Sequence, residues 1–399
     1  MLPKGGSMTR ASIQEYSDAI RKRYTSGLKA EKGKILDEFT KVTGLHRKAA
    51  IRLLRKKSPG TGRKRRGRTK YYGNEVTIAL RMIWEASDRL CSKRLRPFIP
   101  EMLRVLRQHG EQHIDAFVEA QLCQMSPATI DRLLQPWRHL GGRKGLSTTK
   151  PGNFLKNSIP IRTFTEWQEN KPGFLEIDLV AHCGESTVGF YLNTLTTVDI
   201  ASGWTECAIV WGKGQGRVGG AIHRLKEQLP FPLLGLDSDN GSEFINQHLY
   251  DYCRRWHIIF TRSRAYKKND GCYVEQKNWN AVRRVIGYDR YTSKSAYDCL
   301  ERIYNLMRLY MNFFQPTMKL IAKTRHGAKV HKVYDTAQTP YQRLLKSDSV
   351  NQAKRTELAA IYHGLNPIVL LKQLNHNLEN LWKLADRRDS SHPVRIEDK

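Results

Sequence analysis

The stretch LLGLDSDNGSEF, residues 233–244, joins a strand-like segment to a cluster of acids. Apolar and small residues lead into Asp237 and Asp239, and the Asn-Gly pair that follows predicts a sharp turn. Because side chains alternate along a strand, both aspartates are expected to point to the same face. Carboxylates in an apolar setting are costly unless a partner holds them. The stretch therefore predicts a short buried strand whose terminal acids need a partner.

The sequence around this stretch alternates between strand-like and helix-like segments. Segments with period-two patterning predict strands, and amphipathic segments predict helices. The predicted strands are residues 173–182, 187–200, 203–211, 231–237 and 257–263. The predicted helices are residues 214–229, 242–256, 270–287 and 296–314. Three strands, a helix, a strand, a helix, a strand and further helices follow the order of a ribonuclease H-like α/β core.

The composition points to a polyanionic partner. In 399 residues, Lys and Arg number 68 against 38 Asp and Glu, which gives a net charge of +30. Such an excess predicts binding to nucleic acid, above all double-stranded DNA. The seven cysteines form no Cys-x-x-Cys pair, which indicates a reducing compartment and no structural zinc. No apolar run is long enough for a membrane span, so we expect a cytosolic protein.

Residues 8–56 have the apolar spacing of helices, and the last of these helices is strongly basic. A short turn at Thr43-Gly44 precedes the basic helix, which is typical of a helix-turn-helix DNA-binding domain, here residues 1–57. A three-helix bundle without DNA contacts is the alternative. The candidate DNA contacts on the basic helix are Arg47, Lys48, Arg52 and Arg55.

A basic arm and a second helical block follow. Nine of the sixteen residues from 55 to 70 are Lys or Arg, so residues 58–73 predict an arm that contacts phosphates. Residues 74–140 predict a second helical domain, in which Ser126 caps a helix that begins at Pro127. A DNA-reading role and a purely structural role for that helix are equally consistent with the sequence. The candidate contacts of the arm are Arg63, Lys64, Arg65, Arg66 and Arg68.

The remaining boundaries follow from composition. A segment rich in Gly, Lys and Thr predicts a linker over residues 141–165, and the α/β core spans residues 166–316. Residues 317–399 predict a smaller C-terminal region with a basic hairpin that turns at His326-Gly327, followed by helices. The last helix carries leucines at 371, 374, 378 and 381, which favours packing on its own domain over self-association.

Three acids of the core have the residue types and placement of a metal site. Phosphodiester transfer is well served by two divalent ions held by carboxylates, and hard oxygen ligands suit Mg²⁺ or Mn²⁺. Asp178 lies in an apolar strand, Asp239 ends a later strand, and Glu275 lies on a helix. Taken singly, these are an ordinary strand acid, a turn-forming Asp and a surface Glu. Sixty residues separate the first two, and 35 separate the last two.

With the words EID, SDNGSEF and KKNDGCYVEQKNW, the chain resembles the integrase-core (DDE) transposases, which include retroviral integrases and bacterial insertion-sequence transposases. The resemblance covers residues 170–316. It implies a ribonuclease H-like catalytic core in which Asp178, Asp239 and Glu275 hold two Mg²⁺ or Mn²⁺ ions. It also implies no need for ATP. The His-His-Cys-Cys zinc module of the retroviral branch is missing from the sequence.

Residues near Asp178, Asp239 and Glu275 can be assigned expected roles from their positions in the sequence. Glu243 is expected to cap a helix start through its charge. Asp237 competes with Asp239 for the metal position, and we expect it to support a metal ligand or to be structural. Trp279 fits DNA contact and core packing equally well. The cations expected to contact DNA phosphates in and before the helix of Glu275 are Arg262, Arg264, Lys267, Lys268, Lys277 and Arg283.

The resemblance implies a DNA transposase that binds the terminal inverted repeats of an insertion sequence. It would cleave the 3′ ends and join them to target DNA, as a homodimer or a larger assembly. Two alternatives stay open: a non-catalytic DNA-binding protein derived from a transposase, and a structure-selective nuclease of the same fold without strand transfer. In every case the sequence predicts a multidomain protein with all-α helix-turn-helix domains ahead of the α/β core.

Overall fold

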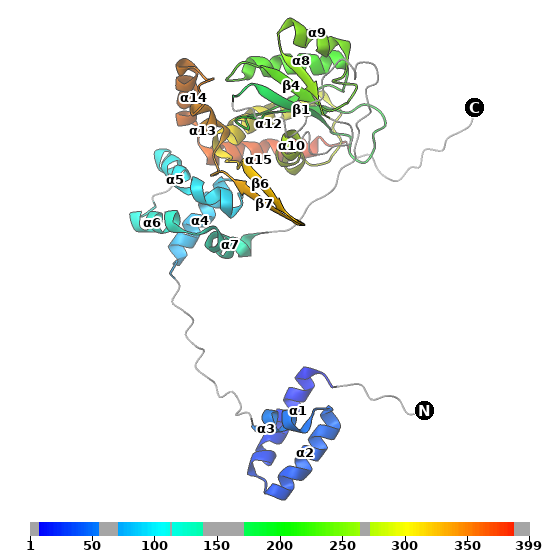
Figure 1. Cartoon of the computed structure of the whole chain (residues 1–399), viewed down its shortest axis with the longest axis vertical. Helices are drawn as coiled ribbons and strands as arrows, with labels where there is room; N and C mark the ends of the chain where they lie inside the picture. Colours follow the sequence, from blue (N-terminus) through cyan, green and yellow to red (C-terminus); the bar gives the residue numbers. More distant parts are fainter. Residues whose placement is uncertain (1–7, 56–70, 112–113, 139–170, 264–271, 387–399) are drawn as a thin grey trace, which may run out of the picture. The chain divides into compact units, whose positions relative to one another are not determined.

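The computed structural model describes residues 8–55, 71–111, 114–138, 171–263 and 272–386. The chain divides into two compact units, Met1–Tyr71 and Tyr72–Lys399. The first unit holds the helices α1 to α3, and the second holds the mixed sheet with its covering helices (Figure 1). Residues 58–70 of the arm predicted at 58–73, and the whole of the linker predicted at 141–165, lie outside the described residues.

The first unit is a bundle of α1 (Arg10–Ser26), α2 (Lys29–Thr43) and α3 (Arg47–Arg55). Gly44, with φ 70°, ends α2 in the left-handed region, so the chain enters α3 after only three residues. The buried side chains of the bundle include Phe39, Ala50 and Leu54. The turn predicted at Thr43-Gly44 and the basic helix behind it are thus present.

The second unit begins with α4 (Asn74–Ala86), α5 (Ser92–Gln108), α6 (Ala116–Gln124) and α7 (Pro127–Leu134), followed by the short η1 (Gln135–Trp137). The predicted cap of α7 is confirmed, because the Ser126 hydroxyl accepts the Thr129 N–H at 3.2 Å. These helices share one hydrophobic core with the sheet. The Tyr310 hydroxyl also donates to the Ala86 carbonyl at 2.8 Å.

The central sheet consists of β1 (Phe174–Ala181), β2 (Asn193–Asp199), β3 (Thr205–Val210), β4 (Gly235–Ser238) and β5 (Ile259–Arg262). The strand order is β3-β2-β1-β4-β5. The first three strands are antiparallel, and β4 and β5 run parallel to β1. This mixed α/β arrangement is consistent with the core expected from the sequence.

The second strand is shorter than predicted, because it begins at Asn193 and not at residue 187. The side chain of Arg290 donates to the carbonyls of Ser186, Val188 and Phe190 at 2.6–2.8 Å. These carbonyls therefore face a guanidinium and not a neighbouring strand. The period-two pattern gave no sign of this distant side chain.

Helices cover both faces of the sheet (Figure 1). One face carries α8 (Gln215–Gln228) and α9 (Gln247–Arg255). The other carries α12 (Lys294–Phe314) and a continuous helical run made of α10 (Cys272–Lys277), the π-helical η3 (Asn278–Arg283) and α11 (Arg284–Ile286). Gly287, with φ 91°, ends this run where the sequence predicts its end.

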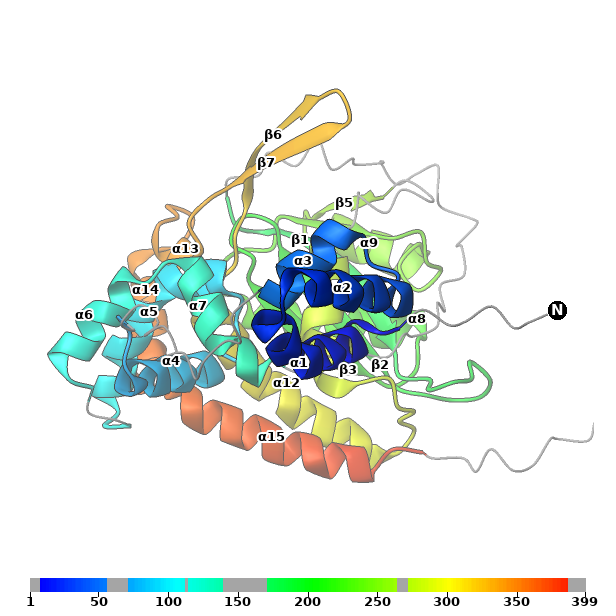
Figure 2. The ribbon, with the colours of Figure 1, turned by 90° about the horizontal axis from the view of Figure 1, so that it is seen from below.

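The C-terminal region confirms the predicted hairpin. Strands β6 (Leu320–His326) and β7 (Lys329–Tyr334) pair antiparallel, and Gly327 takes φ 59° at the tip. Figure 2 shows the hairpin extending away from the body of its unit. Next come α13 (Pro340–Leu345), α14 (Gln352–Gly364) and α15 (Pro367–Lys383). Leu374, Leu378 and Leu381 of α15 are buried within the unit, as the packing interpretation predicts.

None of the helices in the described residues combines the length and the apolar character that a membrane span needs.

Candidate functional site

Four acidic side chains project from one face of β1 and β4. The two strands are parallel neighbours in which Glu176 lies opposite Asp237. Two residues further along each strand, the same register brings Asp178 beside Asp239. Because side chains alternate, all four point to the face covered by the helical run 272–286. We call Asp178 and Asp239 the outer pair, and Glu176 and Asp237 the inner pair.

The outer pair is a place where two carboxylates repel each other. Burial, together with the nearby Asp239 carboxylate, raises the pKa of Asp178 to about 7. Burial likewise raises the pKa of Asp239. A cation between two such carboxylates favours their charged forms. The outer pair thus has the electrostatics of a cation-binding site at the end of a sheet.

Each acid of the outer pair is oriented by a hydrogen bond. The Asn278 Nδ2 donates to Asp178 Oδ2 at 2.6 Å, and the Gly241 N–H donates to Asp239 Oδ1 at 2.9 Å. A Cβ at Gly241 would stand 2.9 Å from that Oδ1 and 2.7 Å from the Glu243 Cδ. A side chain at position 241 would therefore push the carboxylates of Asp239 and Glu243 away from the positions they hold in this turn.

Asn278 ties the helical run to β1, and sequence reasoning missed it. It lies three residues beyond Glu275, so the two side chains are one turn apart on the same face. Its spacing from Glu275 was the available signal, but a lone Asn in a helix says nothing about its partner. The amide oxygen of Asn278 is buried and accepts no hydrogen bond from the described residues.

The inner pair anchors the start of the helical run. Glu176 Oε2 accepts the backbone N–H groups of Tyr273 and Val274, both at 2.9 Å. Burial raises the pKa of Glu176 to about 8, with Asp237 and Glu275 adding to the effect. Asp237 accepts the Thr261 hydroxyl at 2.5 Å. This bonding agrees with the structural role expected for Asp237, and it gives Glu176 a role that the sequence did not reveal.

Glu275 lies on the first turn of α10 with its side chain exposed. Its charge acts on Glu176, which places it near the inner pair. Among the residues that the structure describes, no three His, Cys, Asp or Glu side chains gather closely enough to hold a metal ion. The outer pair supplies two hard oxygen ligands that suit Mg²⁺ or Mn²⁺, and the described part of the chain does not gather Glu275 with them into a three-acid cluster.

The expected role of Glu243 as a helix cap was wrong. Helix α9 begins at Gln247 and not at residue 242, and Asn246 caps it by accepting the Leu249 N–H at 2.9 Å. Glu243 is buried in the preceding turn. Burial raises its pKa, and the Asp239 carboxylate raises it further. Glu243 is therefore a third acid beside the outer pair.

The expected DNA contacts of the core are not equally accessible. Arg262 donates to the Asn240 Oδ1 at 3.1 Å, and Arg283 lies over the Tyr288 ring at 5.0 Å. Lys277 is only 7% exposed, whereas Trp279 is 55% exposed and so does not pack in the core. The positions Arg264, Lys267 and Lys268 lie outside the described residues.

Some of the DNA contacts expected before the second unit are described and exposed, and others lie outside the described residues. On α3, all four basic side chains are exposed, and Arg47 pairs with Asp37. Five further expected contacts lie outside the described residues, namely Arg63, Lys64, Arg65, Arg66 and Arg68.

No family model matches the chain. It is 44% identical over 343 residues to the protein y4rM of Sinorhizobium fredii (strain NBRC 101917 / NGR234), an uncharacterized protein. The match covers 84% of this chain and 96% of that relative.

Solved structures with some likeness include three retroviral proteins. The HTLV-2 integrase catalytic core domain, solved with magnesium, is 17% identical, with a TM-score of 0.28 over 37% of this chain and 91% of that one. The BIV integrase catalytic core domain is 19% identical, with a TM-score of 0.29 over 44% of this chain and 94% of that one. The simian T-cell lymphotropic virus intasome is 14% identical, with a TM-score of 0.32 over 60% of this chain and 73% of that one. All three TM-scores are low.

Proposed function

We propose that this chain, which belongs to the same protein family as y4rM of Sinorhizobium fredii, is an insertion-sequence transposase that cleaves and joins DNA. The observation that carries the proposal is the outer pair. Asp178 and Asp239, separated by 60 residues in the sequence, meet where β4 ends beside the parallel strand β1, and the helix of Glu275 is bonded to Asp178 through Asn278.

In this proposal Asp178, Asp239 and Glu275 hold two Mg²⁺ or Mn²⁺ ions. When bound, the ions activate the attacking oxygen and stabilise the departing one. The residues of this chain do the rest. The inner pair and Asn278 set the position of the helix that carries Glu275, and the turn at Gly241 orients the Asp239 carboxylate. No nucleotide cofactor is needed, because the phosphodiester itself provides the leaving group.

The proposed reaction has two steps that share one geometry. Water first attacks the phosphodiester at an element end, and the bond to the 3′ oxygen breaks to leave a free 3′-hydroxyl. That hydroxyl then attacks a phosphodiester of target DNA, and the target strand is joined as its own 3′ oxygen departs. The outer pair is partly exposed at the point where β4 ends, which is where such a substrate would approach.

We place recognition of the element ends in the first unit. The four exposed cations of α3 and the basic arm at residues 58–70 are suited to a duplex, and the hairpin β6–β7 offers a second basic surface. Since two ends must be held together for joining, we propose a homodimer or larger assembly on DNA. The site of action would be the bacterial cytosol.

The first test is Asp239→Asn in the full-length protein. We expect loss of Mg²⁺-dependent cleavage of a duplex that carries the DNA flanking the gene, including any inverted repeats found there. Asp251→Asn, an exposed acid on α9, is the matched control and should retain activity. Full cleavage activity of the Asp239→Asn variant would contradict the proposal. Nicking without joining by the wild-type protein would favour a nuclease of the same fold.

A further inference from the structure

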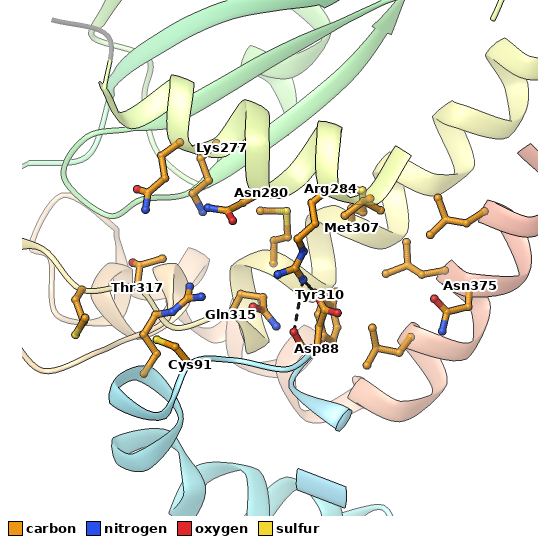
Figure 3. Close-up of a pocket in the computed structure, with 18 of the residues that line it drawn as sticks. Asp88, Cys91, Lys277, Asn280, Arg284, Met307, Tyr310, Gln315, Thr317 and Asn375 are labelled. Atoms are coloured by element: carbon orange, nitrogen blue, oxygen red, sulfur yellow. Dashed lines mark hydrogen bonds and ion pairs between the residues drawn. The ribbon is translucent and has the colours of Figure 1, made fainter. Parts of the chain in front are cut away.

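A pocket of about 610 Å³ lies behind the helical run 272–286, on the side away from the outer pair. Its walls come from that run, from the segment between α4 and α5, and from α12 and α15 (Figure 3). Gln276, Lys277, Asn280 and Arg284 face it from the helical run. The volume falls within the range of small-ligand sites, roughly 300–1,000 Å³. The helix of Glu275 thus has the acids on one side and this pocket on the other.

Lys277 places a buried positive charge in the wall of this pocket. It is 93% buried and lines the pocket, and among the described residues the Cys207 thiol is the neighbour whose charge favours the ammonium. A second cation, Arg94, also lines the pocket and lies near enough to act on the charge of Lys277. Arg94 donates to the Pro316 carbonyl at 3.4 Å, and the one acid of the pocket lining, Asp88, is paired with Arg284. Two cations this near each other repel, and an anion between them would relieve the repulsion. The pair is therefore arranged for an anionic group such as a phosphate.

The rest of the pocket suits a flat heteroaromatic group. Met307, Met311 and Met318 supply adaptable thioether surface, and Tyr310 and Trp382 supply aromatic surface. Asn280, Gln276 and Asn375 add side-chain amides, which can pair with the polar edge of a base. An aliphatic anion would leave these amides without partners.

The rim of the pocket is held in an unusual backbone conformation. Asp88 and Arg89, neither of them glycine, have φ of 51° and 57°. Asp88 forms an ion pair with Arg284, drawn as a dashed line in Figure 3. The turn is held further by Gln315 Nε2, which donates to the Ser87 carbonyl at 3.0 Å. Strained non-glycine residues of this kind persist where the surroundings fix them and are frequent at ligand sites.

We infer that this pocket binds a nucleoside monophosphate, with Lys277 and Arg94 on the phosphate and the Met-lined wall on the base. Such a group has two sources. It is either a free mononucleotide or a single nucleotide that leaves the stack of bound DNA. The second source rests on the proposed function and would link DNA binding to the position of the helix that carries Glu275. The first source does not depend on that function.

Calorimetric titration of the full-length protein tests the site. Deoxyadenosine monophosphate should bind, and inorganic phosphate and deoxyadenosine should each bind at least about tenfold more weakly, because each lacks half of the contacts. Lys277→Met should weaken nucleotide binding by about tenfold or more. Lys372→Met, an exposed lysine of α15 outside the pocket, is the matched control and should bind normally.

A second arm separates the two sources. A duplex with one unpaired nucleotide should bind about tenfold more tightly than its fully paired counterpart if the ligand comes from DNA, and Lys277→Met should remove that difference. Asp239→Asn, which the proposed function expects to be inactive in cleavage, should bind nucleotide normally. A result against nucleotide binding in the pocket can thereby be distinguished from a result against the proposed DNA cleavage.

The outcome of Lys277→Met on folding is also decisive. Removing this buried charge should raise the melting temperature of the ligand-free protein, whereas removing a lysine with a structural role would lower it. Asn375→Trp, at the exposed rim on α15, blocks the pocket without touching Lys277 and should abolish nucleotide binding. Absence of nucleotide binding together with no preference for the unpaired duplex overturns the inference. Equal binding of phosphate and nucleotide overturns it as well.

Discussion

At the scale of single residues, two glutamates compete to complete the proposed metal site. Glu243 is buried beside the outer pair, whereas Glu275 is exposed and near Glu176. The sequence spacing and the family resemblance favour Glu275 as the third metal ligand. In the structure, however, it is Glu243 whose charge interacts with both acids of the outer pair. Both residues therefore stand as candidates for the third metal-binding position, and their amide variants distinguish them.

We predict that Glu275→Gln lowers Mg²⁺-dependent cleavage by more than about a hundredfold, because it removes a metal ligand, and that Glu243→Gln lowers it by less. Both substitutions keep the side-chain volume. Cleavage rates at saturating Mg²⁺, together with the Mg²⁺ concentration for half-maximal rate, provide the measurement. The reverse order of effects would move the third metal-binding position to Glu243.

Glu176 is predicted to act through the helix that it anchors. Glu176→Gln keeps an oxygen that accepts the Tyr273 and Val274 amides, so cleavage and stability should stay near those of the wild type. Glu176→Leu leaves these two amides without a partner and should lower the free energy of unfolding by about 2 kcal/mol, with a larger loss of cleavage. Denaturant unfolding and cleavage rates are compared for both. If both variants lost the same stability and cleavage activity, the charge of Glu176 would be the cause, and not its hydrogen bonds to the Tyr273 and Val274 amides.

His182 predicts a pH dependence of stability. Its Nε2 lies 2.7 Å from the Thr194 hydroxyl, and burial, aided by Arg283, lowers its pKa to about 3 from the ordinary 6.5. The unfolded chain therefore binds the proton more readily, so this contribution is complete above about pH 6.5 and is lost as the pH falls. Between about pH 7.5 and pH 5 the loss is about 2 kcal/mol.

The measurement is the free energy of unfolding of wild type minus that of His182→Gln over this range. The buried acids with raised pKa act in the opposite direction, and the difference between the two proteins removes their common effect. A difference that does not change with pH would contradict the prediction.

The residue scale also shows what the sequence could not reveal. The alternation of Asp237 and Asp239 was visible in the sequence, but the register with β1 that makes an inner and an outer pair was not. Register depends on the packing of both faces of the sheet. For the same reason Glu176 and Asn278, whose partners lie about a hundred residues away, gave no local signal.

At the scale of elements, the sequence predicted the type of most helices and strands but not their irregularities. The helix expected over residues 270–287 is present from Cys272 to Ile286. Its middle turn, Asn278–Arg283, is π-helical, which the spacing of apolar residues did not indicate. A π-turn is set by what the helix packs against, and here Asn278 bonds to Asp178 at the start of that turn.

The hairpin β6–β7 is predicted to bind DNA without reading its sequence. Its side chains are almost all exposed, so replacing them should leave the melting temperature unchanged. Glutamine at Lys323, Arg325, Lys329 and Lys332 should weaken binding to any duplex and reduce the slope of log affinity against log salt by up to about 4. Fluorescence anisotropy over a salt series gives the slope. An unchanged slope would show that the hairpin does not contact phosphates.

At the scale of the whole molecule, the net charge can be read from the sequence, whereas the packing between distant segments cannot. The basic stretch at residues 55–70 predicted a division, and the structure separates Met1–Tyr71 from the rest. The helices α4 to α7, expected as a domain of their own, share a compact unit with the sheet. Contacts such as Tyr310 to Ala86 join segments more than two hundred residues apart, which no local pattern encodes.

The division into two units leads to a prediction about specificity. In the proposal, the first unit reads the element ends, and the second supplies catalysis and phosphate contacts. Substitutions on α3 should then reduce sequence preference, whereas substitutions on the hairpin β6–β7 should reduce overall DNA affinity. Arg52→Ala with Arg55→Ala on α3 should reduce the preference for end-sequence DNA over random DNA by about tenfold or more, because base contacts are lost. The hairpin variant should weaken binding to both duplexes equally and leave the ratio intact. Competition binding with the two duplexes at fixed salt measures the ratio, with Lys372→Gln on α15 as the control. If the α3 variant weakens both duplexes equally, α3 contacts only phosphates, and the reading of the ends has to be sought in the second unit.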